Sequence, residues 1–80
     1  MKTKTIKIRF VKHNDIFMIQ RKAWFGWTYI RYEQGGDAGK ASFIYTNENK
    51  KGLLELVLEG YYRADKRFLT IKEYPTIKIH

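Results

Sequence analysis

The chain of 80 residues carries sixteen lysines and arginines against eight acids, a net charge of +8, and no cysteine. This length allows a single domain over residues 1–80 with one thin core, and the lack of cysteine excludes a disulfide framework and a thiolate nucleophile. No apolar run approaches the roughly 20 residues of a membrane span or follows the basic start, so we expect a cytoplasmic protein without a signal peptide.

Two strands joined by a turn are predicted at the start of the chain. The side chains of residues 4–11 alternate between apolar and polar, a period of two that indicates a half-buried β-strand. The segment His13-Asn14-Asp15 predicts a turn, because Asn and Asp tolerate the left-handed conformation and bond their own backbone. A second strand is expected over residues 16–24.

A second hairpin and a glycine-rich loop follow. Phe25 and Gly26 mark the next reversal, because Gly adopts a positive φ without strain, and residues 27–33 predict a third strand. The segment 34–39 is rich in glycine and predicts a loop, after which residues 41–46 predict a fourth strand.

The parity of the two hairpins, meaning whether their strands pair at an even or an odd offset, determines which side chains share a face of the sheet. Two-residue turns would place Phe10 opposite Phe17 and Trp24 opposite Trp27, and a one-residue slip would mix apolar and charged side chains on both faces. The predicted core face holds Ile6, Ile8, Phe10, Phe17, Ile19, Ala23, Ile30 and Tyr32, with Arg21 either at its rim or paired with an acid. The opposite face holds Lys7, Arg9, Met18, Gln20, Lys22, Trp24, Trp27, Tyr29 and Arg31.

An amphipathic helix is predicted next, with Asn47 or Asn49 as its cap. Apolar residues then recur at helical spacing and form a stripe that should cover the core face of the sheet. The stripe consists of Leu53, Leu54, Val57, Leu58, Tyr61 and Tyr62. The cationic segment 63–67 suits the negative end of the helix dipole.

The last residues predict one or two further strands. Residues 68–74 alternate again, and Pro75 interrupts the hydrogen-bonded ladder, which indicates an edge strand or two short strands, the second over residues 77–79. The order ββββαβ predicts an α+β domain, with an antiparallel sheet of four to five strands and one helix packed on one face.

The glycine-rich loop resembles a phosphate-binding P-loop only at first sight. Gln34 stands where the motif needs its first Gly, and Ala41 stands where it needs Ser or Thr. A strand is predicted after this loop, whereas a P-loop leads into a helix. We therefore interpret the segment as a hairpin loop.

Residues suited to metal binding or catalysis are few and scattered. His13 and His80 are the only histidines, which disfavours a zinc site. Ser42 lies in a predicted strand with no histidine near it in sequence, so Glu33 and Asp37 are the remaining candidates, as an acid pair. Two acids beside a turn are usually solvated, so we predict a protein that is not an enzyme and has no metal or cofactor.

Positive charge and aromatic residues are concentrated together near the start of the chain. Residues 1–32 hold eight basic residues and one acid, whereas residues 33–80 hold eight basic and seven acidic residues. Strand parity gathers part of this charge beside aromatic side chains on the face turned away from the core, as on surfaces that bind polyanions. We therefore expect cations to contact phosphates and aromatic rings to stack on or wedge between bases, in single-stranded or duplex nucleic acid. The predicted site is Lys7, Arg9, Lys22, Trp24, Trp27, Tyr29 and Arg31.

Other interpretations of this face remain open. Trp24 and Trp27 would also stabilise a plain hairpin as a cross-strand pair, and the C-terminal strands would bury them by folding over the face. A basic surface also serves solubility alone. Alternatively, the face docks on an acidic host protein with these tryptophans as hot spots, or an exposed edge strand extends the partner's sheet.

Three family resemblances accompany these patterns. Basic strands followed by a helix, over about residues 16–62, resemble the three-stranded DNA-reading sheets of phage integrase arm-binding domains and plant AP2 domains. The strand 40–45 resembles the aromatic strand of RNA-recognition motifs, although the order of elements differs. The short basic chain, its Trp24-Phe25-Gly26-Trp27 hairpin and its single late helix most resemble small uncharacterised bacteriophage accessory proteins. This last resemblance implies a protein that binds nucleic acid or modulates a host protein.

Overall fold

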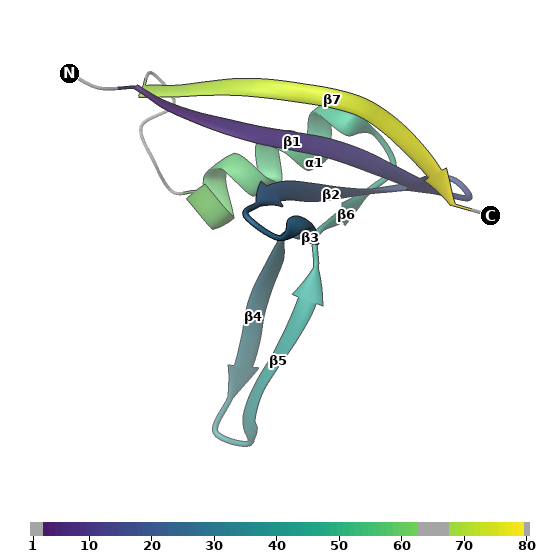
Figure 1. Cartoon of the computed structure of the whole chain (residues 1–80). Coiled ribbons are helices and arrows are strands. Elements are labelled where there is room, and N and C mark those ends of the chain that lie inside the picture. Colours follow the sequence, from purple (N-terminus) through teal and green to yellow (C-terminus); the bar gives the residue numbers. More distant parts are fainter. Residues whose placement is uncertain (1–2, 63–67, 80) are drawn as a thin grey trace.

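The computed structural model describes residues 3–62 and 68–79, which form a small α+β fold (Figure 1). Its strands are β1 (Lys4–His13), β2 (Ile16–Ala23), β3 (Gly26–Tyr29), β4 (Arg31–Gly36), β5 (Gly39–Ile44), β6 (Thr46–Asn47) and β7 (Leu69–Ile79). Helix α1 (Lys50–Val57) continues into a single π-helical turn, η1 (Leu58–Tyr62). The α+β class is confirmed, but the prediction of four to five strands is too low.

The main sheet has the order β3-β2-β1-β7, and the short strand β6 also pairs with β2. Strand β7 runs parallel to β1, whereas β1, β3 and β6 are all antiparallel to β2 (Figure 1). The prediction of a purely antiparallel sheet is therefore wrong. The reason is the connection from β6 through α1 to β7, because a helix that crosses over a sheet returns the chain in its original direction.

Strands three and four of the prediction are each divided in two. Ile30 separates β3 from β4, because its N–H donates to the carbonyl of Ile19 (3.1 Å) and its carbonyl accepts from Tyr45 N–H (3.3 Å). Beyond these bonds, β4 and β5 pair only with each other and form a two-stranded ribbon that projects from the body (Figure 1). We call residues 31–44 the β4–β5 arm. Its residues 31–43 are all exposed.

The hairpin registers differ from the prediction by two residues, which leaves the faces unchanged. Phe10 lies opposite Ile19, not Phe17, because the turn places Asn14 at a φ of 56°. In the second hairpin Trp27 lies opposite Lys22 rather than Trp24, because Gly26 begins β3 with a φ of 133°. A shift of two preserves the alternation of side chains between faces, so the predicted parity is confirmed for β1, β2 and β3.

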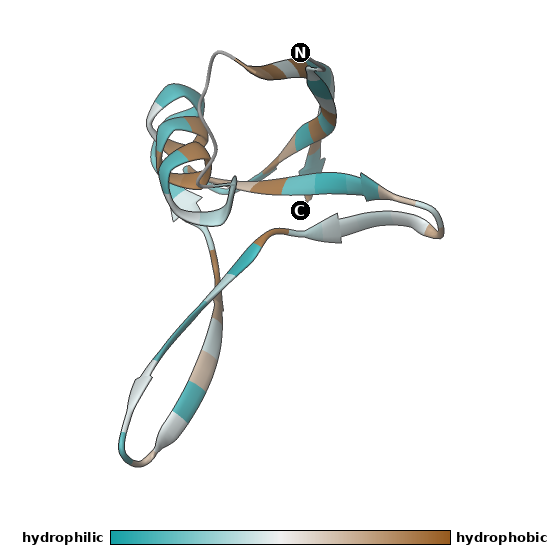
Figure 2. Ribbon diagram, turned by 90° about the vertical axis from the view of Figure 1, so that its left-hand side faces the viewer, coloured by the Kyte–Doolittle hydropathy of each residue, from teal (hydrophilic) through white to brown (hydrophobic). Residues whose placement is uncertain are grey.

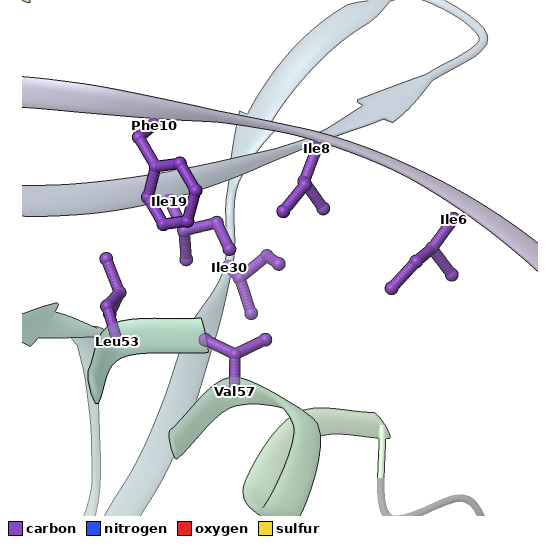
Figure 3. Close-up of a cluster of buried hydrophobic side chains, with 7 residues drawn as sticks. All are labelled: Ile6, Ile8, Phe10, Ile19, Ile30, Leu53 and Val57. Carbon is purple, nitrogen blue, oxygen red and sulfur yellow. The ribbon is translucent and has the colours of Figure 1, made fainter. Parts of the chain in front are cut away.

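The core lies between the main sheet and the helix, as Figure 3 shows. Its buried side chains come from two strands, β1 and β2, from the Ile30 junction and from the helix: Ile6, Ile8, Phe10, Ile19, Ile30, Leu53 and Val57. Of the predicted helical stripe, Leu53 and Val57 belong to this core, and Leu54, Leu58 and Tyr62 pack against it as expected. Tyr61 is exposed. Tyr32, predicted in the core face, lies in the β4–β5 arm and is exposed.

The helix start and the following turn have identifiable causes. Asn49 is the cap, and its side-chain oxygen accepts a hydrogen bond from the backbone N–H of Gly52 (2.6 Å). Gly60 lets Tyr45 pack against η1, because a Cβ at this position would collide with the tyrosine hydroxyl. The predicted role of residues 63–67 at the helix end lies outside the described residues.

The predicted C-terminal edge strand is confirmed. Strand β7 spans Pro75 without ending there, and its register against β1 shifts between Tyr74 and Ile77. Because β7 lies at the end of the sheet order, the missing N–H of the proline costs the sheet no ladder bond.

Candidate nucleic-acid interface

The face of the main sheet opposite the helix carries side chains arranged in rows across the strands. One row runs from Tyr29 through Gln20 and Arg9 to Tyr74, in the order β3, β2, β1, β7. Beside it, Trp27 lies opposite Lys22, and Lys7 lies opposite Lys72. We call this set the basic-aromatic face: Lys7, Arg9, Gln20, Lys22, Trp27, Tyr29, Lys72 and Tyr74. Among the strand residues that the structure describes, no aspartate or glutamate shares this face.

Arg9 occupies the centre of the basic-aromatic face in a fixed position. Its Nε donates a hydrogen bond to the side-chain oxygen of Gln20 (2.6 Å), and Gln20 is only 7% exposed. The guanidinium carbon lies 4.6 Å from the ring centroid of Trp27, a cation–π contact. Because Nε and one ring hold the side chain, its terminal N–H groups have a defined direction before any ligand arrives.

Trp27 closes over this arginine instead of lying open to solvent. Its ring centroid is 5.1 Å from that of Tyr74 at an interplanar angle of 73°, although β3 and β7 are at opposite ends of the strand order. The two rings therefore lean toward each other across β2 and β1, and Trp27 lies against Arg9 between them. Trp27 is half-buried and also lies below Lys22 Nζ (5.6 Å from the ring centroid).

The other tryptophan has the opposite environment. Trp24 and Phe25 form the turn between β2 and β3 and are 95% and 63% exposed. Their rings contact each other edge to face, with centroids 5.4 Å apart. Figure 2 shows the β2–β3 hairpin extending away from the helix, so its tip projects into solvent. Large apolar side chains exposed at such a tip are typical of a contact surface.

Five of the seven predicted site residues lie together on the basic-aromatic face: Lys7, Arg9, Lys22, Trp27 and Tyr29. Trp24 lies beside them, in the adjoining turn. Arg31 does not join them, because the chain leaves the main sheet at Ile30 and places Arg31 in the β4–β5 arm opposite Ile44. The predicted face is therefore wrong for Arg31.

The structure adds residues that the sequence interpretation missed. Lys72 and Tyr74 complete the two rows from β7, and Lys72 Nζ lies 5.3 Å from the Tyr74 ring centroid. The alternation of residues 68–74 already separated this pair from Leu69 and Ile71. What the alternation could not indicate was the partner strand. Phe25, which the sequence interpretation treated as a turn residue, forms the exposed tip with Trp24.

The arm and the scattered polar residues offer little alternative chemistry. Glu33 lies 3.8 Å from Lys40 in an exposed ion pair, and Gly36 pairs with Gly39, so the glycine-rich segment is a hairpin loop as predicted. Within residues 3–62 and 68–79, no three His, Cys, Asp or Glu side chains are grouped as a metal site would require. The described helix is too short to cross a membrane.

Comparisons with protein-family models, with curated proteins and with solved structures found no match to this chain.

Proposed function

We propose that this protein is a non-enzymatic module that binds single-stranded nucleic acid along its basic-aromatic face. The main support is the distribution of charge, because four cations share a face that carries no acid among the described strand residues: Lys7, Arg9, Lys22 and Lys72. Neutralisation of phosphates by lysine and arginine supplies most of the sequence-independent affinity for nucleic acids. A polyanion is therefore the partner whose charge complements this face.

Arg9 is the cation best prepared for a phosphate. Its hydrogen bond to Gln20 and its contact with Trp27 leave the two terminal nitrogens without a hydrogen bond to any described residue. A guanidinium presents parallel N–H groups that match two phosphate oxygens. Because the side chain is already ordered, less conformational entropy is lost when the phosphate binds.

The exposed turn favours a single strand over a duplex. Trp24 and Phe25 offer ring surface to solvent, and unpaired bases stack on such rings for about 1–3 kcal/mol each. The bases of a duplex are already stacked on each other and are not free to do so. In this arrangement the basic-aromatic face holds the sugar–phosphate backbone, and the turn holds a base.

Fluorescence anisotropy with a labelled oligonucleotide tests the proposal. Four phosphate contacts on a single strand predict a slope of log affinity against log salt of about −3, or roughly a 50-fold loss between 50 and 200 mM salt. The same sequence as a duplex should bind more weakly. Little binding at about 50 mM salt, or an affinity indifferent to salt, would contradict nucleic-acid binding. Tighter binding of the duplex would contradict the single-strand choice.

A second candidate function is based on the β4–β5 arm. This ribbon projects from the body with Tyr32 and Phe43 both partly exposed and with a tilted ring contact between them (5.6 Å). Its cations and acids balance, so it does not complement a polyanion. We propose as the alternative that the arm docks on a host protein whose activity it modulates, either by these rings or by adding strands to the partner's sheet.

A shortened arm separates the two candidates. Residues 33–42 are replaced by an Asn-Gly turn that joins Tyr32 to Phe43, which lie opposite each other in the ribbon. If the arm is the functional element, the full chain captures a stoichiometric protein from nuclease-treated lysate and the shortened chain does not. Unchanged capture by the shortened chain contradicts a role for the arm. Unchanged oligonucleotide affinity is expected of the shortened chain under the nucleic-acid proposal.

A further inference from the structure

A cationic pocket lies at a step in the main sheet, next to the basic-aromatic face. The paired residues of β1 and β2 begin at Ile8 and Arg21, so residues 4–7 of β1 pair with no residue of β2 and leave one strand edge open. The pocket beside this open edge has a volume of about 310 Å³. That value is at the lower end of the range for small-ligand sites, about 300–1,000 Å³. Its lining residues are Lys4, Thr5, Ile6, Lys7, Arg21, Lys22, Tyr61 and Tyr62.

The polar side chains of this pocket suit an anion. Among the described residues that line it, four are cations, three carry hydroxyl groups, and none is an acid. No side-chain hydrogen bond or ion pair links Lys4, Lys7 or Arg21 to another residue in the part of the chain that the structure describes. These cations are therefore available to a ligand. Unpaired cations that converge on one pocket repel each other, and a bound anion relieves that repulsion.

Arg21 and Tyr62 both line this pocket and are half-buried. Arg21 is half-buried on the core side of β2, where the sequence interpretation placed it at the rim, and its charge acts on the nearby Tyr62 hydroxyl. Burial, together with the neighbouring Tyr61, raises the pKa of Tyr62 above its usual value of 10.0, and Arg21 opposes this only in part. The Tyr62 hydroxyl thus stays protonated at neutral pH and is able to donate a hydrogen bond.

We propose that this pocket binds the terminal phosphate monoester of a nucleic-acid strand. A monoester carries up to two negative charges at neutral pH and three acceptor oxygens, so it gains more from several converging cations than a phosphodiester does. Lys22 connects the two surfaces, because it lines the pocket and also lies on the basic-aromatic face against Trp27. Lys22 also lies just before the exposed Trp24, on which the terminal base would stack.

The inference depends on the proposed function, since the pocket selects an end of a strand that the basic-aromatic face already holds. Three internally labelled oligonucleotides of one sequence separate the two claims: one with a 5′-phosphate, one with a 3′-phosphate and one with hydroxyl groups at both ends. We expect one phosphorylated strand to bind about tenfold more tightly than the hydroxyl strand, the size of a charge-assisted hydrogen bond. The replacement Arg21→Gln should abolish this difference, whereas Lys51→Gln on the exposed side of α1 should preserve it.

Four results would overturn the inference in different ways. Equal, salt-dependent affinity for all three oligonucleotides contradicts the end site but leaves the proposed function intact. The absence of binding by any of them contradicts both. If inorganic phosphate shifts the NMR signals of Arg21 while the three strands bind alike, the pocket takes free phosphate and not a strand end. Because Arg21 is half-buried, Lys4→Gln is a second variant, and its exposed side chain makes it safe for folding. A preference that survives both replacements also contradicts the assignment.

Discussion

The two tryptophans should affect different properties when each is replaced by alanine: Trp24 the affinity for an oligonucleotide, and Trp27 the stability of the fold. Trp24 is 95% exposed and its ring contacts that of its neighbour in the turn, Phe25, so Trp24→Ala should change the free energy of unfolding by less than about 0.5 kcal/mol. The same change should remove about 1–3 kcal/mol of base stacking, which corresponds to a loss of roughly 5- to 150-fold in oligonucleotide affinity.

Trp27→Ala should act mainly on stability. The half-buried indole packs edge to face on Tyr74 and lies over the guanidinium of Arg9, so its removal exposes both partners and the buried Gln20. An aromatic pair contributes about 0.5–1.5 kcal/mol and a cation–π contact about 0.5–2 kcal/mol. We expect a loss of about 2 kcal/mol in the free energy of unfolding. Loss of affinity should follow only because Arg9 becomes mobile.

Urea denaturation and fluorescence anisotropy on both variants measure these effects separately. Trp24→Phe is the matched control, because it keeps a ring at the tip and should retain most of the affinity. The reasoning is refuted if Trp24→Ala lowers stability by more than about 1 kcal/mol, since an exposed side chain has little packing to lose. It is equally refuted if Trp24→Ala binds the oligonucleotide as well as the unchanged chain does.

Three further replacements test other parts of the structure. Lys22→Gln should make the slope of log oligonucleotide affinity against log salt less steep by about 0.7, measured by anisotropy. Lys51→Gln removes an equal charge from the exposed side of α1 and should leave this slope unchanged. Gly60→Ala should cost about 1–3 kcal/mol in urea denaturation, because the new Cβ collides with a tyrosine hydroxyl, and Gly36→Ala in the open arm should cost less than half of that. Asn49→Ala should cost about 1 kcal/mol through the lost helix cap, and equal stability of Asn49→Ala and Asn49→Asp would contradict the capping role.

Much of the candidate site was predictable because strand parity is a local property. Lys7 and Arg9 alternate with the core residues Ile6 and Ile8, and this alternation survives any even shift in register. The register itself was predicted wrongly by two residues in both hairpins, yet Lys22 and Trp27 still share the predicted face. The helix stripe was predictable for the same reason, since its spacing depends only on the helical period.

Arg31 shows where parity fails. Alternation assigns it to the same face as Tyr29, provided that the strand continues through Ile30. In the structure, the backbone of Ile30 bonds to Ile19 on one side and to Tyr45 on the other, and the ribbon beyond it leaves the sheet. That break depends on a residue fifteen positions later in the chain, Tyr45, which a local pattern does not include.

The sequence by itself determined most of the core residues of β1, β2 and the helix, which strands alternate, and that positive charge lies on the face away from the core. These properties depend on periods of two and 3.6 residues, which short segments express without knowledge of their neighbours. Only the tertiary structure decided that β7 lies parallel to β1, that Trp27 closes over Arg9 while Trp24 stays exposed, and that Arg21 and Lys4 meet in one pocket. Each of these depends on contacts between segments distant in the chain, whose formation is governed by packing of the whole core and not by local preference.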